Sequence, residues 1–497
     1  MMNLPTTPQL PQVVYSAKQV LANELMAATQ AQLSLSELMN RAGMAVFQLL
    51  MDLYGDDKRY LVLTGKGNNA GDGFVVASAL LKVASVTVHC VEDPLLLQGD
   101  ALAAFTHYQQ QGGSYSVHVP ILTDYDVIID ALFGAGFHGQ LPSHYQQLIE
   151  KVNQASVKRL SIDVPSGVNA NTGEVSAGAF CADACLSFIG LKAGLLTGKA
   201  RQYVGQLYFD GLGVDQHFNQ LVSPLAEYMS AQQLLVLRPQ RQLASYKNQC
   251  GHLLVIGGGQ GMGGAARLAA EAGLRAGAGL VTVATHPDNV QAVLQGRYEL
   301  MVHGISQVTQ LDELISRATC IVLGPGLGQS IWAKSIFEHV LMANQLPMVI
   351  DADALNLLAQ TPTPFDLSKA VLTPHSGEAG RLLNCSNTQI EQDRLAAIQA
   401  LVSQYQATIV LKGPGSLIAN QQQLNINHSG CGAMASAGMG DLLTGITGAL
   451  IAQGLSLFDA SCLAVYIHGL AGEEAAKEGQ LGLLASDLLL PLRRLLG

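Results

Sequence analysis

Short apolar runs alternate with longer segments of helical periodicity along most of the chain. In the first half, the apolar runs predict buried strands at 60–63, 86–91, 127–129 and 160–162. The helical segments lie at 16–53, 73–83 and 99–112. We expect Ser16 to cap the first helix, and Ser34 or Ser36 to cap a second one. Strands that alternate with helices favour a parallel sheet with right-handed crossovers.

The alternation lapses between 215 and 245, where Pro224, Pro239 and several glutamines interrupt it. A second series then predicts strands at 253–256, 280–284, 320–323, 348–350, 370–372 and 408–411. The helices of this series are expected at 264–277, 331–344, 376–384, 391–405, 440–452 and 458–477. The fold class is therefore α/β with two domains, at 1–222 and 228–497.

Composition supports this interpretation and narrows the range of partners. Hydrophobic residues make up 49% of the 497 residues and charged residues only 13%, as suits parallel strands buried on both faces. The net charge of -10 argues against nucleic acid as the main partner, because a duplex attracts basic surfaces. A local basic pocket for a phosphorylated metabolite stays compatible with this balance.

Cysteine spacing and hydropathy bear on the compartment. Only Cys181 and Cys185 of the 8 cysteines lie close together, which favours reduced thiols over a zinc site or a disulfide framework. The N-terminal stretch lacks the basic start and apolar run of a signal peptide, and no segment has the ~18 apolar residues of a membrane helix. We expect a soluble, cytoplasmic protein without membrane contacts.

The strongest chemical signal in the second half is Gly438-Met439-Gly440-Asp441, directly before an apolar helix. Glycines at a helix start let backbone N–H groups converge on an anion. Asp441 is then placed to accept the proton of an attacking hydroxyl during phosphoryl transfer. Taken alone, the same four residues also suit an ordinary capped helix.

Four further polar loops follow strands of this half, and each alone can be a turn or a cap. They are GPGLG at 324–328, DADALN at 351–356, TPHSGE at 373–378 and KGPGS at 412–416. The carboxylates of 351–356 suit Mg²⁺ held through water, and His375 suits substrate contact. Because ligands of α/β sheets bind at carboxyl ends of strands, five such loops indicate one shared site.

Together these motifs resemble the ribokinase-like superfamily, and more narrowly its NAD(P)H-hydrate dehydratase branch. The resemblance covers 245–470 and departs at Cys431, where the family usually has Asn. It implies ADP as phosphoryl donor, Mg²⁺, and Asp441 as the catalytic base. The ADP contacts it implies are Lys412, Gly413, Pro414, Gly415, Ser416 and Gly440. The implied contacts of the hydrated dinucleotide are Ala265, Gly326, His375 and Asp441.

The first half carries its own strand-end motifs. GKGNNAGDG at 65–73 joins a strand to a helix, and its amides and N–H groups suit phosphate, although Asn and Gly also suit turns. Asp130 and Asp163 each come directly after a strand, where a buried carboxylate needs a partner or serves as a cap. The combination favours a binding site.

This half resembles the YjeF N-terminal domain, the NAD(P)H-hydrate epimerase family, over about 40–215. The resemblance implies a potassium ion held by Asn69, Asp130 and Ser166. The implied substrate contacts are Asn68, Asn69, Ala70, Gly71, Asp72, Gly134, Ala135, Gly136, Phe137, His138, Gly139, Gln140 and Asp163. Ala70 and Ala135 depart from a frequent Gly and a frequent Thr. We take Asp163 as the proton-handling residue.

Both resemblances lead to one hypothesis, the repair of hydrated NADH and NADPH by a homo-oligomeric enzyme. The first domain would interconvert the two epimers, and the second would use ADP to remove the hydroxyl as phosphate, leaving AMP. Three alternatives stay open. One is a ribokinase-like small-molecule kinase whose N-terminal domain binds nucleotide without catalysis. The others are a scaffold role for that domain and a dinucleotide-dependent dehydrogenase suggested by the Gly257–Gly264 loop.

Overall fold

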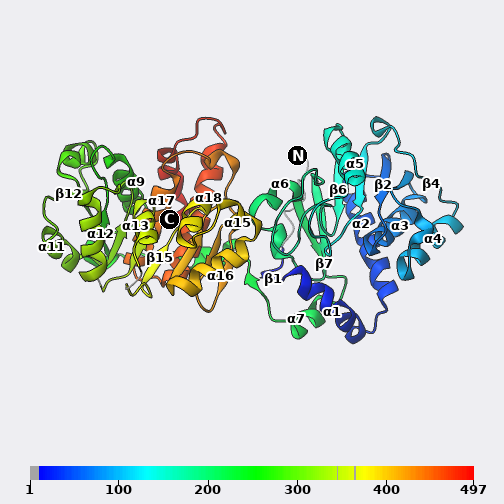
Figure 1. Cartoon of the computed structure of the whole chain (residues 1–497), viewed down its shortest axis with the longest axis horizontal. Helices are drawn as coiled ribbons and strands as arrows, with labels where there is room; N and C mark the ends of the chain where they lie inside the picture. Colours follow the sequence, from blue (N-terminus) through cyan, green and yellow to red (C-terminus); the bar gives the residue numbers. More distant parts are fainter. Residues whose placement is uncertain (1–9, 344, 363–364) are drawn as a thin grey trace. The chain divides into compact units, whose positions relative to one another are not determined.

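The computed structural model describes residues 10–343, 345–362 and 365–497. It divides into two compact units, Met1–Glu227 and Tyr228–Gly497 (Figure 1). Residues 1–9, which carry most of the N-terminal stretch judged against a signal peptide, and residue 344, the expected end of a helix, lie outside the described residues. No helix of the described residues is long and apolar enough to cross a membrane.

The first unit is built on a sheet with strand order β4-β3-β2-β5-β6-β7-β8, and all its pairings are parallel. Its strands are β2 (Arg59–Thr64), β3 (Ser85–Cys90), β4 (Tyr115–Ser116), β5 (Val127–Ala131), β6 (Lys158–Ile162), β7 (Ala184–Phe188) and β8 (Gln206–Asp210). Separately, β1 (Val13–Val14) pairs antiparallel with β9 (Ala226–Glu227). Because β2, β5 and β6 are adjacent and parallel, the loops that follow them lie at one edge of the sheet.

Helices cover both faces of this sheet. Tyr60 and Val62 belong to a core shared with α2 (Leu35–Tyr54) and α3 (Asn68–Leu80), whereas Leu61 and Leu63 pack with α5 (Ser143–Gln154). Alternate residues of one strand therefore face opposite layers. The remaining helices of the argument are α1 (Ala17–Gln30), α4 (Gly99–Gln110) and α7 (Asp215–Leu221). The expected three-layer, Rossmann-like arrangement is confirmed.

Local sequence determines where two helices of this unit begin. Capping boxes formed by Ser16 with Gln19 and by Ser34 with Glu37 begin α1 and α2, so Ser34 and not Ser36 is the second cap. The expectation that the next helix begins at Gly73 is wrong, because α3 already begins at Asn68. Gly73 is packed against β5, since a Cβ there would meet that of Ala131 at 2.6 Å.

The second unit holds a sheet with strand order β18-β17-β16-β15-β14-β13-β10-β11-β12. Its parallel strands are β10 (His252–Ile256), β11 (Leu280–Thr285), β12 (Met301–Gly304), β13 (Cys320–Leu323), β14 (Met348–Ile350), β15 (Ala370–Leu372) and β16 (Thr408–Leu411). Antiparallel strands β17 (Leu417–Ala419) and β18 (Leu424–Ile426) extend it. The loops after β10, β13, β14, β15 and β16 all leave this sheet at its carboxyl edge.

Helices again lie on both faces of the sheet. One core joins Val255, Val322 and Val349 to α9 (Gly263–Arg275), α17 (Met439–Ala452) and α18 (Leu457–Ala476). The other α-helices in the described part of this unit are α8 (Ala231–Val236), α10 (Val290–Leu294), α11 (Gln310–Arg317), α12 (Ile331–Ala343), α13 (Asp353–Gln360), α14 (Ser376–Leu382), α15 (Asn387–Gln392), α16 (Arg394–Tyr405) and α19 (Leu489–Leu496). The predicted two-domain α/β fold class is confirmed, and the apolar α17 is a core helix whose first turn points to the sheet's carboxyl edge.

Candidate functional sites

Asp441 lies in the first turn of α17. The helix begins after Gly438, whose φ of 87° is a left-handed conformation that glycine adopts without strain. Burial and the charge of the neighbouring Asp351 together raise the pKa of the Asp441 carboxyl to about 7, against the opposing charge of Lys412. A carboxylate with that pKa can accept a proton at neutral pH and release it again.

Lys412 and Asp351 form an ion pair beside Asp441. The Lys412 ammonium donates to Asp351 Oδ1 at 2.7 Å, and the Thr444 hydroxyl donates to Oδ2 at 2.6 Å. Glu378 Oε2 lies 3.7 Å from the same ammonium. Burial lowers the pKa of Lys412, but Asp351 and Glu378 outweigh it, so the net shift is upward and the cation is retained. The site therefore holds one fixed positive charge among several carboxylates.

Glycines at this edge let backbone segments approach closely. At Gly326, with a φ of 57°, a Cβ would lie 2.6 Å from the Met262 carbonyl oxygen and 3.0 Å from the Ala265 Cβ. This brings together Ala265 and Gly326, two residues that the family resemblance implies as contacts of the hydrated dinucleotide. At Gly440 a Cβ would lie 3.4 Å from the Lys412 ammonium, so this glycine keeps open the space between cation and base.

His375 caps a helix and keeps part of its ring exposed. Its Nδ1 accepts the backbone N–H of Gly377 at 2.9 Å, so the ring caps α14, while about half of the side chain stays exposed. Burial lowers the pKa of His375, and the Lys412 charge lowers it further. The ring is therefore a neutral cap beside the ion pair, and the two interpretations of this residue are compatible.

The 324–328 loop is tied to the DADALN segment. Asp353 Oδ2 accepts the Gly328 N–H at 2.8 Å, and α13 has no side-chain cap, so Asp353 does not serve as one. Within the described residues, no three His, Cys, Asp or Glu side chains converge to hold a metal. A direct protein cage for Mg²⁺ is therefore not formed there, and phosphate or water oxygens would have to complete the coordination.

The KGPGS segment is the turn between the antiparallel strands β16 and β17. The Ser416 hydroxyl donates to the Gly413 carbonyl oxygen at 2.9 Å, which closes the turn, while Gly413 and Pro414 are exposed and Gly415 is buried. The strand-to-strand turn is therefore confirmed, and the binding of ADP by this segment stays a prediction. Cys431 is exposed on the loop that precedes α17.

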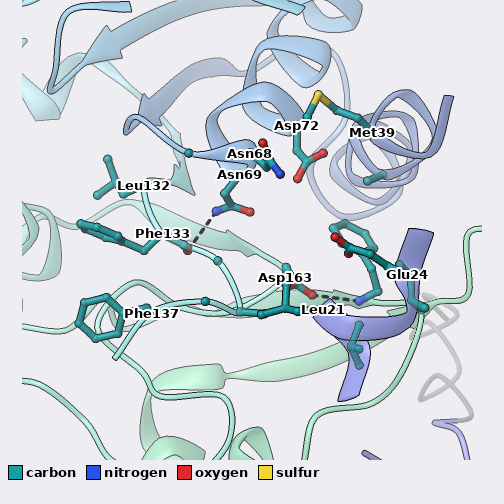
Figure 2. Close-up of a pocket in the computed structure, with 18 of the residues that line it drawn as sticks. Leu21, Glu24, Met39, Asn68, Asn69, Asp72, Leu132, Phe133, Phe137 and Asp163 are labelled. Atoms are coloured by element: carbon teal, nitrogen blue, oxygen red, sulfur yellow. Dashed lines mark hydrogen bonds between the residues drawn. The ribbon is translucent and has the colours of Figure 1, made fainter. Parts of the chain in front are cut away.

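The first unit has a cavity of about 620 Å³ at the carboxyl edge of its sheet (Figure 2). It is lined by ten of the residues implied for the substrate: Asn68, Asn69, Asp72, Gly134, Ala135, Gly136, Phe137, His138, Gln140 and Asp163. The other three lie elsewhere. Ala70 and Gly71 are buried in the first turns of α3, where a Cβ on Gly71 would meet Met39, and Gly139 is an exposed left-handed turn residue.

Asp163 is held by a buried lysine. Its backbone adopts a φ of 64°, and its Oδ1 accepts the Phe188 N–H at 3.1 Å and the ammonium of Lys192. The Lys192 side chain is 1% exposed, and it also donates to the Phe188 carbonyl oxygen at 2.9 Å and to Ser187 Oγ at 3.2 Å. Three acceptors therefore meet the three N–H bonds of the ammonium.

Asp130 is the centre of a buried oxygen cluster. Its carboxylate accepts the Ser166 hydroxyl at 2.6 Å and the Ser166 N–H at 2.8 Å, and burial raises its pKa to about 6 against these hydrogen bonds. Asn69 Nδ2 donates to the Phe133 carbonyl oxygen at 3.0 Å, which lies 3.4 Å from the same hydroxyl. The cluster thus offers amide, carbonyl, hydroxyl and carboxylate oxygens that together carry one negative charge. Such a set suits a monovalent cation such as potassium.

Comparison with known proteins identifies both units. Residues 253–493 match the NAD(P)H-hydrate dehydratase family and residues 35–194 the YjeF-related protein N-terminus family. The bifunctional NAD(P)H-hydrate repair enzyme of Coxiella burnetii is 42% identical over 97% of this chain and 99% of its own length. The enzyme of that name in Escherichia coli is 41% identical over 98% and 94%. The chain belongs to the bifunctional NAD(P)H-hydrate repair enzymes.

A solved structure supports the fold of the second unit in this family member. A ribokinase-like superfamily protein of Enterococcus faecalis matches with a TM-score of 0.51 and 32% identity, over 54% of this chain and 94% of the other. The predicted ribokinase-like fold and both family resemblances are confirmed. The alternative of a small-molecule kinase with a non-catalytic N-terminal domain is not favoured, because the full-length relatives carry both domains under one bifunctional name.

Sequence reasoning missed three charged residues that this repair-enzyme chain places at its sites. Lys192 stands alone in the apolar run 186–196, which is a signal that a buried cation has a partner there. Arg394 is completely buried and donates to the Leu411 and Lys412 carbonyl oxygens at 3.1 Å each, which fixes the turn that carries Lys412. Glu24 of α1 lines the cavity of the first unit, and nothing in its local sequence marks it.

Proposed function

We propose that this chain restores hydrated NADH and NADPH in two steps. The first unit interconverts the R and S epimers, and the second uses ADP to dehydrate the S epimer, releasing AMP and phosphate. The observation that carries the second step is Asp441, a carboxyl with a pKa of about 7, beside the Lys412–Asp351 pair at a helix N-terminus. That arrangement suits a base for phosphoryl transfer.

In this proposal the dehydration takes place in two stages, transfer of a phosphoryl group and then loss of phosphate. Asp441 accepts the proton of the C6 hydroxyl, whose oxygen attacks the terminal phosphorus of ADP, and AMP leaves. The ring nitrogen lone pair then expels phosphate from C6, and loss of a proton from C5 restores the reduced nicotinamide. Lys412 and the N–H groups at 438–440 would stabilise the charge on the transferring group. Gly413–Ser416 would hold the donor, and Ala265, Gly326 and His375 the hydrated ring.

Two metal ions belong to this proposal. Mg²⁺, bound mainly to the donor's phosphates, would supply charge neutralisation beside Asp351 and Asp353. Potassium would be held by Asn69, Asp130 and Ser166, where it offsets the buried carboxylate. The protein's own part in epimerisation is to enclose the hydrated ring between the 68–72 segment, the 134–140 loop and Asp163.

One incubation tests the central claim. The protein is mixed with hydrated NADH and either ADP or ATP, and recovery of the absorbance of reduced nicotinamide is followed. We expect recovery with ADP, together with stoichiometric AMP and free phosphate. A stable phosphoester in place of free phosphate would instead indicate a conventional small-molecule kinase. We also propose a cytoplasmic homo-oligomer, which light scattering of the purified protein and fractionation of its cells test.

A further inference from the structure

Among the titratable groups that line the cavity of the first unit, three carboxyls and one ammonium lie close enough to act on one another electrostatically. Glu24 comes from α1, Asp72 from α3, and Asp163 from the end of β6, while Lys192 follows β7. Figure 2 shows the Asp72 and Glu24 side chains on the same side of the cavity as Asp163. Within this cluster of four side chains one cation accompanies three carboxyls, so the cluster holds either excess negative charge or a proton.

Lys192 forms an ion pair with Asp163. Its ammonium donates to Asp163 Oδ1, and the Phe188 N–H donates to the same oxygen at 3.1 Å, so Asp163 is held as a carboxylate. By contrast, across the described part of the chain no hydrogen bond or ion pair reaches the carboxyl of Glu24 or of Asp72. Partly buried polar groups that line a cavity without protein partners are available to a ligand.

Burial favours the neutral form of both carboxyls that lack protein partners. Burial raises the pKa of Asp72 well above its usual value, and the charges of Asp163 and Glu24 add to the shift. Burial also raises the pKa of Glu24, with Asp163 adding to the shift and Lys192 opposing it. Since the charges of Asp163 and Glu24 both disfavour ionisation of Asp72, whereas Lys192 favours ionisation of Glu24, we assign the proton to Asp72 and the charge to Glu24. Carboxyls whose pKa values are driven apart serve as acid and base.

We propose that Asp72 and Glu24 are the acid–base pair of epimerisation, with the ionised Asp163 orienting the ring. This inference rests on the proposed function of the first unit. Asp72 gives its proton to the C6 hydroxyl, the C6–O bond breaks, and the ring nitrogen lone pair forms a C=N bond as water leaves. Water then adds to the other face of C6 and gives a proton to Glu24. Proton exchange between the carboxyls through water resets the pair.

The pair has a defined pH signature. Glu24 must be ionised, so the rate falls as pH drops below its pKa, and Asp72 must be protonated, so the rate falls as pH rises above its pKa. The kcat of the wild-type protein should therefore have a bell-shaped dependence on pH. The other titratable groups that face the cavity are Lys66, Asp100, His138, Asp163 and Lys192. None of these is removed by Glu24→Gln or Asp72→Asn, so a lost limb identifies its residue.

The test measures exchange between the epimers by NMR, above the uncatalysed rate, for wild type, Glu24→Gln and Asp72→Asn. We expect kcat to fall about 10²- to 10⁴-fold with little change in KM, and the acid limb to vanish in Glu24→Gln and the alkaline limb in Asp72→Asn. Glu24→Asp and Asp72→Glu should recover part of the rate. Asp52→Asn, at an exposed carboxylate of α2, is the matched control.

The possible outcomes separate this inference from the proposed function of the first unit. If exchange is lost while dehydratase activity and melting temperature are unchanged in the two variants, the loss is not due to misfolding. That result supports the acid–base pair. Near-normal kcat in either amide variant, with wild type active, overturns this inference and leaves the proposed function intact. A wild-type protein that does not accelerate exchange at all overturns both.

Discussion

The ammonium of Lys412 lies 2.7 Å from Asp351 Oδ1, and the Thr444 hydroxyl occupies the other oxygen of that carboxylate. Asp351 is therefore fixed as a charged group next to the base. Its charge raises the pKa of Asp441 whereas the charge of Lys412 lowers it, and with burial the balance is about 7. Burial is the largest cause of this shift, and the ion pair adjusts the pKa of a carboxyl to which neither of its partners is hydrogen-bonded.

Asp441→Asn should abolish ADP-dependent repair and leave epimerisation intact. An amide keeps the size of the side chain but cannot accept the hydroxyl proton, so we expect a loss of about 10²- to 10⁴-fold in kcat. Recovery of reduced-nicotinamide absorbance measures the first activity and NMR exchange the second. Near-normal repair in this variant would refute the assignment of the base.

The dehydratase rate should rise with pH through about 7, because Asp441 acts in its ionised form. Below that value we expect roughly a tenfold decrease per pH unit. Lys412→Gln removes the charge that lowers the Asp441 pKa, so the limb should move to higher pH as well as the rate falling. A pH profile of kcat at saturating ADP measures both. A limb that stays in place would separate Lys412 from the base.

Gly440→Ala should fold normally and lose activity. A Cβ there would lie 3.4 Å from the Lys412 ammonium and 3.6 Å from Asp351 Oδ2, which is tolerable for the chain but occupies space beside the base. Gly432→Ala is a matched control, since a Cβ there meets nothing within 4 Å. Melting temperature and kcat/KM of both variants decide the matter. Equal activities would mean that this space is not used.

Asp130→Asn should remove the potassium dependence of epimerisation and leave the dehydratase unaffected. The amide retains the shape of the buried carboxyl but not the charge that balances a cation. Exchange rates in potassium chloride and in tetramethylammonium chloride, at equal ionic strength, measure the dependence. If both activities fell together, a shared site would replace the present division of labour.

Much of the fold follows from the sequence because its central strands are continuous apolar runs. Strands such as 127–129 and 253–256 are recovered within a few residues, and each ends at a loop that carries polar groups. Strands β7 and β8 were missed, since their pattern mixes polar and apolar residues and the pairing partner decides. The start of α3 was missed because Gly71 and Gly73 look like turn residues, whereas packing against Met39 and Ala131 requires them inside a helix.

The sites show a similar division. Motif residues such as Asp163, Lys412 and Asp441 follow a strand or begin a helix, so topology alone brings each to the carboxyl edge of its own sheet. Their partners lack such marks. Arg394 lies in a helix of ordinary appearance, and Glu24 comes from the first helix of the chain, so only the folded arrangement brings them to the sites. Long-range partnerships of this kind are not encoded in local spacing.

The left-handed backbone of Asp163 has a consequence for how this enzyme can vary. Glycine and asparagine accept a φ of 64° readily, whereas most other side chains are strained there. Glycine and asparagine both remove the charge that balances Lys192. Of the amino acids one base change away from aspartate, none satisfies both demands, so this codon has almost no neutral neighbours. In a population, alleles that change Asp163 should be rare. A substitution that survives should come with a second change at Lys192.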